Sequence, residues 1–170
     1  MRLSSLVWAG CLLAASPGQD PEYPKKAALT KTDLRKPLLR GYVLSDSVKP
    51  ADKPAARKAA IGSHQLLFID VDGNGRFDDL GTDGWTLTGQ KYLFPLEEGA
   101  VLGTDEIQWK ISEDAGAIRY RVTPLKAKKE YLDTLVLLND LRMRNGLPPA
   151  SFDVKLSEGC EKHALYMDRY

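Results

Sequence analysis

Cysteine and histidine are scarce in this sequence. Only two residues of each type occur among the 170. Two cysteines exclude a small scaffold held together by several disulfide bonds, and two histidines leave little material for a histidine-based site. Between residues 20 and 170 there is also no nucleophile motif, Walker loop, zinc-ligand spacing or dinucleotide-binding fingerprint. The sequence therefore indicates no enzymatic reaction of its own.

An excess of charge of either sign is lacking as well. The chain has 24 Lys and Arg residues against 23 Asp and Glu residues, so its net charge is +1. Such a balance creates no overall field that attracts nucleic acid or anionic lipid, and we expect no nucleic-acid partner. The 43% of apolar and 28% of charged residues are ordinary for a globular protein. These values exclude a disordered chain, a collagen and a coiled-coil rod, and the length predicts one domain or slightly more.

A pronounced apolar run is found near the N-terminus. Arg2 precedes the apolar residues 6–15, and the small residues 16–18 follow them. This run is too short to span a bilayer and fits a secretory signal over residues 1–19. A buried N-terminal helix is the alternative. The signal predicts a secreted, periplasmic or cell-envelope protein whose mature chain has no transmembrane span.

The position of Cys11 allows a second interpretation of this segment. Cys11 follows Ala9 and Gly10, as in a lipoprotein signal, although Trp8 stands where such signals usually have leucine. Lipid anchoring through Cys11 is therefore the minor alternative. Ordinary cleavage would remove Cys11 and leave Cys160 as the only thiol, which would be unpaired or would pair outside this chain.

The middle of the chain has the pattern of a small β domain. Residues 20–37 are rich in Pro, Lys and Asp and predict an extended linker, and the polar residues 46–60 predict a loop with room for a short helix after Pro54. Residues 38–125 predict a β-rich accessory domain with a small antiparallel sheet or sandwich, in which 107–111 and 117–122 form a hairpin. The expected strands are 39–44, 65–71, 84–87, 91–96, 107–111 and 117–122.

After this region the period of the apolar residues changes to that of a helix. Residues 127–145 predict a helix that ends at Gly146, because glycine favours the left-handed conformation past a helix end. A second helix is expected after Asp153, a good N-cap residue. His163 lies one heptad after Leu156 and is expected to be a partly buried packing residue. The fold class is thus α+β: a small antiparallel β domain followed by two helices.

Residues 70–79 form the most specific local motif. Their spacing matches the first positions of an EF-hand-type calcium loop, with acidic or amide side chains at positions one, three, five and nine, a sharp turn at Gly75 and an apolar anchor at Phe77. Ca²⁺ takes six to eight hard oxygen ligands, and alternating acidic residues on a tight loop can supply them. The predicted ligand residues are Asp70, Asp72, Asn74, Arg76 through its backbone carbonyl, Asp78 and Asp83.

The loop also departs from the EF-hand pattern. Position twelve is Gly81 instead of the bidentate glutamate, so Asp79 or Asp83 would have to substitute. The flanking residues predict strands, and the loop resembles the calcium loops of the DxDxDG type found outside true EF-hands. The alternative is a plain hairpin turn, for which Asp-Gly and Asn-Gly are well suited. Repulsion among the carboxylates favours a structural Ca²⁺ ion over the plain turn.

The C-terminal part carries an ordered set of residues with a characteristic spacing. It reads Leu138-Asn139, Arg142, 146–149 (Gly-Leu-Pro-Pro), Phe152-Asp153, Leu156, His163-Ala164 and Met167. Through this set, residues 128–170 resemble the opening of a CAP domain of the bacterial type. The CAP superfamily comprises cysteine-rich secretory proteins, antigen 5 and pathogenesis-related proteins.

The resemblance implies a secreted α-β-α sandwich domain, whose cleft in many members is built from two His and two Glu. Residues 126–170 would supply its first two helices, and the cleft residues would lie in later segments. His163 does not match the first cleft histidine by position. We therefore expect the N-terminal part of a longer protein that acts as a binding or interaction module, with an unidentified envelope or protein partner. An extracellular hydrolase with its catalytic residues beyond residue 170 and a purely structural calcium-binding β domain are the alternatives.

Overall fold

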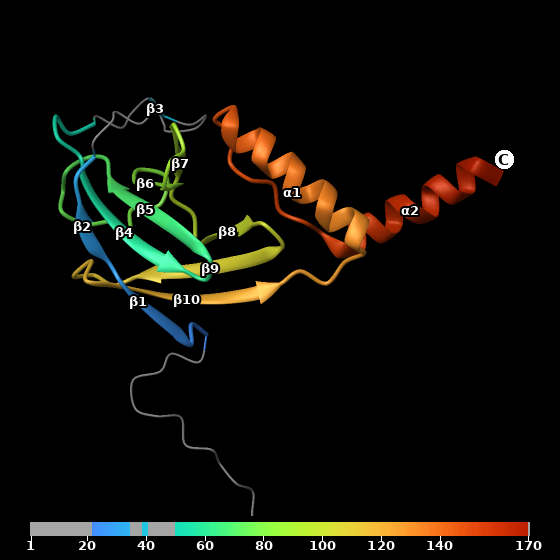
Figure 1. Cartoon of the computed structure of the whole chain (residues 1–170), viewed down its shortest axis with the longest axis horizontal. Coiled ribbons are helices and arrows are strands. Elements are labelled where there is room, and N and C mark those ends of the chain that lie inside the picture. Colours follow the sequence, from blue (N-terminus) through green and yellow to red (C-terminus); the bar gives the residue numbers. More distant parts are fainter. Residues whose placement is uncertain (1–21, 35–38, 41–49, 170) are drawn as a thin grey trace, which may run out of the picture.

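The computed structural model describes residues 22–34, 39–40 and 50–169. The expected signal segment, Cys11 and the 41–44 part of the first expected strand lie outside the described residues. Strands come first along the chain and two helices follow (Figure 1). The elements are β1 (Lys25–Ala28), β2 (Thr30–Thr32), β3 (Leu39–Arg40), β4 (Ala55–Ile61), β5 (His64–Asp70), β6 (Gly84–Leu87), β7 (Tyr92–Pro95), β8 (Gly99–Leu102), β9 (Asp105–Ile111), β10 (Ala117–Pro124), α1 (Lys129–Arg144) and α2 (Val154–Arg169).

The strands form two sheets. The four-stranded sheet has the order β1-β10-β9-β8, and the six-stranded sheet has the order β2-β4-β5-β6-β7-β3. All described pairs are antiparallel except the short pair of β3 with β7, which is parallel. The α+β class and the hairpin of β9 with β10 are confirmed, and β6 has the predicted bounds.

One hydrophobic core is shared by the two sheets. Phe68 of β5 and Trp109 of β9 meet edge to face, with their ring centroids 5.7 Å apart. Trp109 also contacts Trp85 of β6 at 5.3 Å. Edge-to-face pairs of this kind stabilise a core beyond the apolar area that they bury. These aromatic contacts therefore join the four-stranded sheet to the six-stranded sheet.

The expected linker over residues 20–37 is wrong in its middle part. Lys25–Ala28 pairs with β10 in one sheet, and Thr30–Thr32 pairs with β4 in the other. Between them Leu29 is only 4% exposed, and its N–H donates to the carbonyl of Gly116. Most side chains of these two strands remain exposed, so the apolar alternation that would have predicted strands is missing from the sequence.

The expected loop over residues 46–60 is also corrected. Ala55–Ile61 forms β4, every residue of which pairs with β5. Ala, Arg and Lys prefer helices, but pairing on both sides with β2 and β5 overrides this weak preference. Gly99–Leu102 forms the additional strand β8, which the sequence does not predict.

The chain between the two helices is tied to α1 by polar contacts. The side-chain amide of Asn139, which is 2% exposed, donates to the carbonyl of Ala150 at 3.1 Å and accepts from its N–H at 2.7 Å. Arg142 donates to the carbonyl of Pro148 at 2.9 Å. Gly146 has a φ of 76°, which confirms the predicted end of α1. Asp153 caps α2, because its carboxylate accepts from the N–H of Leu156 at 3.0 Å.

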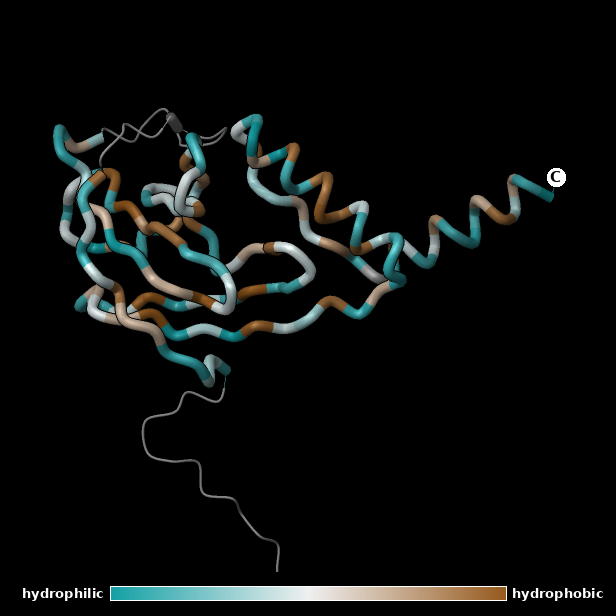
Figure 2. The backbone as a smooth tube through the Cα atoms, in the orientation of Figure 1, coloured by the Kyte–Doolittle hydropathy of each residue, from teal (hydrophilic) through white to brown (hydrophobic). Residues whose placement is uncertain are grey.

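The two helices leave much of their apolar surface exposed. Leu137 is 61% exposed on α1 and Leu156 is 69% exposed on α2. Figure 2 shows hydrophobic segments along both helices, which lie outside the β region, with α2 pointing away from it. His163 is exposed, so the expectation of a partly buried packing residue is wrong. Among the described helices, none combines the length and apolar character that crossing a membrane requires.

Candidate metal centre

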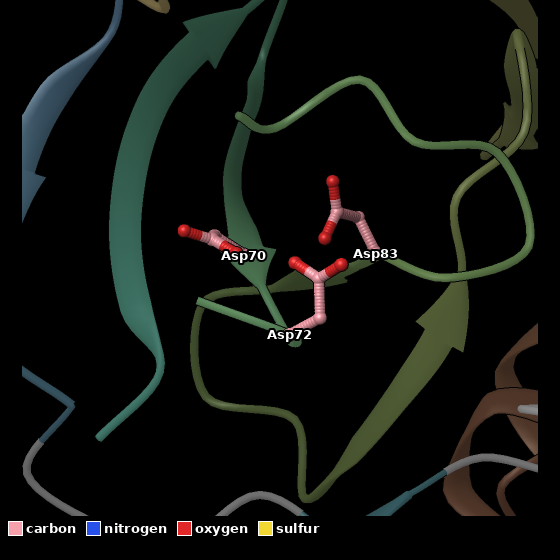
Figure 3. A group of neighbouring side chains, drawn as sticks. All are labelled: Asp70, Asp72 and Asp83. Atoms are coloured by element: carbon pink, nitrogen blue, oxygen red, sulfur yellow. The ribbon is translucent and has the colours of Figure 1, made fainter. Parts of the chain in front are cut away.

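A cluster of three carboxylates lies where β5 ends. Asp70 is the last residue of β5, Asp72 follows in the loop and Asp83 directly precedes β6 (Figure 3). One carboxylate oxygen from each residue lies within 4.8 Å of the others. Ile69 pairs with Gly84 between β5 and β6, and this register brings Asp83 beside Asp70. This cluster could hold a metal ion.

The loop backbone orients the Asp70 carboxylate. Asp70 is 1% exposed, and its two carboxylate oxygens accept from the N–H groups of Gly73 at 2.7 Å and Gly75 at 2.9 Å. Both glycines have left-handed φ values, 78° and 86°, which residues with a Cβ atom rarely adopt. The tight turn that the Gly75 position predicts therefore forms, and it folds back onto the first acidic residue of the loop.

The Asp83 carboxylate is likewise held by backbone N–H groups. Asp83 is 1% exposed, and its oxygens accept from the N–H groups of Val71 and Asp79, both at 3.1 Å. Burial raises the pKa of Asp83 to about 7, and the nearby carboxylates of Asp70 and Asp79 add to this effect, while the two backbone hydrogen bonds oppose it. A neighbouring cation would stabilise the ionised form of this buried carboxylate, because it would compensate the negative charge.

The remaining predicted ligand residues lie around the cluster. The amide nitrogen of Asn74 donates to Asp72 at 3.1 Å and to Asp79 at 2.6 Å, so Asn74 links two carboxylates. Asp78 instead pairs with the Arg76 side chain at 3.0 Å, and its hydrogen bond raises the pKa of Arg76. Asp70, Asp72 and Asp83 are thus brought together, whereas the carboxylate of Asp78 is turned to the Arg76 guanidinium.

The loop is anchored in the hydrophobic core at the predicted position. Phe77 is 3% exposed and belongs to the core cluster, and the guanidinium of Arg57 lies 5.2 Å from the centre of its ring. Because Asp70 and Asp83 are buried while Asp72 is exposed, the group faces solvent on one side. A cation could therefore enter without opening the β region.

Glu106, Gln108 and Arg121 form another polar group in the β region. Gln108 donates to Glu106 at 2.9 Å and accepts a hydrogen bond from Arg121. No motif indicates this group, because the register of β9 with β10 places Arg121 opposite Gln108. The sequence could have indicated that Gln108 and Arg121 lie on the outer face of the predicted hairpin, because alternate residues point away from the core, but Glu106 lies outside its predicted bounds.

Comparisons of the chain with protein-family models, with curated proteins and with solved structures find no match. The resemblance of residues 128–170 to CAP domains therefore stays a prediction, as does the identity of the cation. The chemistry assigned to the centre rests on its own residues and their geometry.

Proposed function

We propose that this chain is a secreted or envelope-associated binding module, in which a structural Ca²⁺ ion stabilises the β region. The group of three carboxylates, with Asp70 and Asp83 buried and Asp72 exposed, is the observation that carries the proposal. Its role is structural because the ion would connect the end of β5 to the start of β6. No catalytic residue is assigned.

The chemistry of the ligands favours Ca²⁺ over softer metals. The group offers carboxylate oxygens and no His or Cys ligand among the described residues, and hard oxygen ligands suit Ca²⁺. The spacing of Asp70, Asp72 and Asn74, with a turn at Gly75, is the spacing of a calcium loop. Asp83 supplies a carboxylate that the missing glutamate at position twelve would otherwise provide. An exported protein would also meet abundant free Ca²⁺.

The C-terminal region supports assignment to the CAP superfamily through the roles of its characteristic residues. Asn139 holds the returning loop at Ala150, Arg142 holds it at Pro148, and Gly146 makes the turn after α1. Three residues of the CAP-like pattern therefore have structural roles in this chain. The exposed apolar residues of α1 and α2 further support a role in interaction.

Calcium titration of the full chain tests this proposal. We expect saturating Ca²⁺ to raise the midpoint of thermal unfolding by several degrees relative to chelator, because a ligand that binds only the folded state stabilises it. The variant Asp72→Asn should lose most of this shift. Asp72 is exposed and accepts hydrogen bonds only from Asn74 in the described structure, so the variant should still fold.

Asp168→Asn is the matched control, because it removes an equal charge from an exposed position on α2. It should keep the full calcium shift. Identical melting of the unaltered chain with Ca²⁺ and with chelator would refute the calcium site. Stronger stabilisation by Mg²⁺ than by Ca²⁺ would refute the identity of the ion.

A further inference from the structure

A second site is indicated by a cavity on the four-stranded sheet. The cavity has a volume of about 520 Å³ and lies between β8–β10, residues 22–23 and the loop that joins the helices. This volume is within the range of pockets that bind small molecules or short peptide segments. The charged and aromatic residues in its wall include Glu22, Glu97, Glu98, Glu106, Arg121 and Phe152.

The register of the strands shapes the floor of this cavity. Arg121 of β10 lies opposite Gln108 of β9, which lies opposite Gly99 of β8. Gly99 has no side chain, and a Cβ atom there would come within 2.3 Å of the carbonyl oxygen of Ile107. These three opposed residues therefore place a guanidinium on β10, an amide on β9 and no side chain on β8. The absence of a side chain at Gly99 leaves space above β8 at this end of the floor.

The floor of the cavity carries side chains that form hydrogen bonds and could bind a peptide. Gln108 bridges Glu106 and Arg121. The buried Nε–H of Arg121 has no hydrogen-bond acceptor among the described residues, and leaving such a donor unpaired is costly. A peptide carbonyl in the cavity would reach this donor only after the Arg121 side chain moves, because the nitrogen atom is closed to solvent.

The outer edge of β8, which pairs with no other strand among the described residues, supplies a second element of recognition. β8 is at the end of the four-stranded sheet, and its residues Gly99, Ala100 and Val101 line the cavity. An edge strand presents unpaired N–H and C=O groups, to which an extended peptide can add as a further strand. A small amine or a metal ion would leave these backbone groups unused.

The charge of the wall selects the kind of peptide. Glu97 and Glu98 lie beside the edge strand, and Glu106 extends the same negative wall, against the single guanidinium of Arg121. An anionic ligand such as a nucleic acid would be repelled, whereas a basic side chain would be attracted. Among the described residues, the close carboxylate group that could bind a metal is the separate one at Asp70.

We propose that this cavity binds an extended peptide segment that carries a lysine or arginine side chain. The basic side chain lies among the glutamates, and the peptide backbone pairs with the edge of β8. The inference rests on the binding role proposed above and names the chemistry of the partner. It is independent of the calcium centre.

Calorimetric titration of the full chain tests the inference. The probe is a five-residue acetylated and amidated peptide with a central arginine between valines, and serines at its ends. The comparison peptides carry glutamate in place of arginine, or N-methyl groups that block strand pairing. At about 50 mM salt, where screening is weak, we expect the arginine peptide to bind at least about tenfold more tightly than either comparison peptide.

The double variant Glu98→Gln with Glu106→Gln should weaken binding of the arginine peptide about tenfold. Glu113→Gln is the control, since Glu113 is exposed in the turn after β9, and it should change the affinity less than twofold. All variants should keep the calcium-induced shift of the thermal unfolding midpoint, which shows that they fold. This measurement also separates a failure of the peptide site from a failure of the calcium site. Absence of binding, equal binding of the glutamate or N-methylated peptide, or an unaffected double variant would each overturn the inference.

Discussion

The β region, residues 25–124, and the helical region, residues 129–169, differ in how they bury apolar side chains. Phe68 and Phe94 are completely buried between the sheets, whereas Leu137 is 61% and Leu156 is 69% exposed on the helices. The buried residues of α1 are Leu135, Asn139 and Met143, and one of them is polar. The β region is therefore specified by packing over long sequence distances, and the helices are specified mainly by local caps and turns.

The largest contrast between the regions should appear in core substitutions. Phe68→Ala should lower the free energy of unfolding by about 4 kcal/mol, because it leaves a cavity beside Trp109. Leu137→Ala should change it by less than about 0.5 kcal/mol, since the side chain is exposed. Urea unfolding of both variants measures the difference. Equal losses would mean that the Leu137 face is buried in solution.

The buried carboxylate of the β region should make stability depend on pH. The pKa of Asp83 is about 7 in the folded chain against an ordinary 3.8, so the native state holds more protons than the unfolded state between these values. The stability that this group contributes is present below the ordinary pKa and is lost as the pH rises through 7. In the metal-free chain, we expect a loss of roughly 2–4 kcal/mol over this window.

Urea unfolding with chelator at both ends of the pH window measures this loss. Asp83→Asn provides the reference, because an amide does not titrate in this range, and the slope attributed to Asp83 should be missing from it. Excess Ca²⁺ should flatten the slope near neutral pH, because the ion compensates the ionised group. A variant with the same slope as the unaltered chain would show that Asp83 does not titrate as described.

A smaller effect is expected in the helical region, where one polar residue holds the returning loop. Asn139→Ala should destabilise the loop by about 2 kcal/mol, because it leaves the part-buried N–H and carbonyl of Ala150 without their partner. Hydrogen exchange should become faster in residues 147–153 and stay unchanged in β5. Asn145→Ala, at an exposed helix end, is the control. Faster exchange throughout the chain would indicate that the two regions unfold together.

The sequence predicts the local features of the fold well. The end of α1 at Gly146 and the cap of α2 at Asp153 follow from single residues, because glycine tolerates the left-handed conformation and aspartate accepts from a free N–H. The Asp70–Asp72 spacing likewise predicts the start of the acidic group. These features depend on residues that are neighbours in the sequence.

Features that depend on distant pairing are harder to predict. β4 has the composition of a helix and becomes a strand because it lies between β2 and β5. Asp83 could be named as one candidate from the sequence, but its place beside Asp70 follows from the β5–β6 register. The group of Glu106, Gln108 and Arg121 likewise depends on how β9 and β10 align. The register of the strands decides which side chains meet. The local amino-acid composition determines this register only weakly.

The passage of the chain through Leu29 has a consequence for the order in which the protein acquires its structure. β1 pairs with β10, the last strand of the β region, while β2 pairs with β4 in the other sheet. During synthesis, β1 must therefore wait for its partner until β10 has been made. Contacts between such distant residues slow folding. Although β1 precedes the other described strands in the sequence, its pairing is completed only when β10 is available.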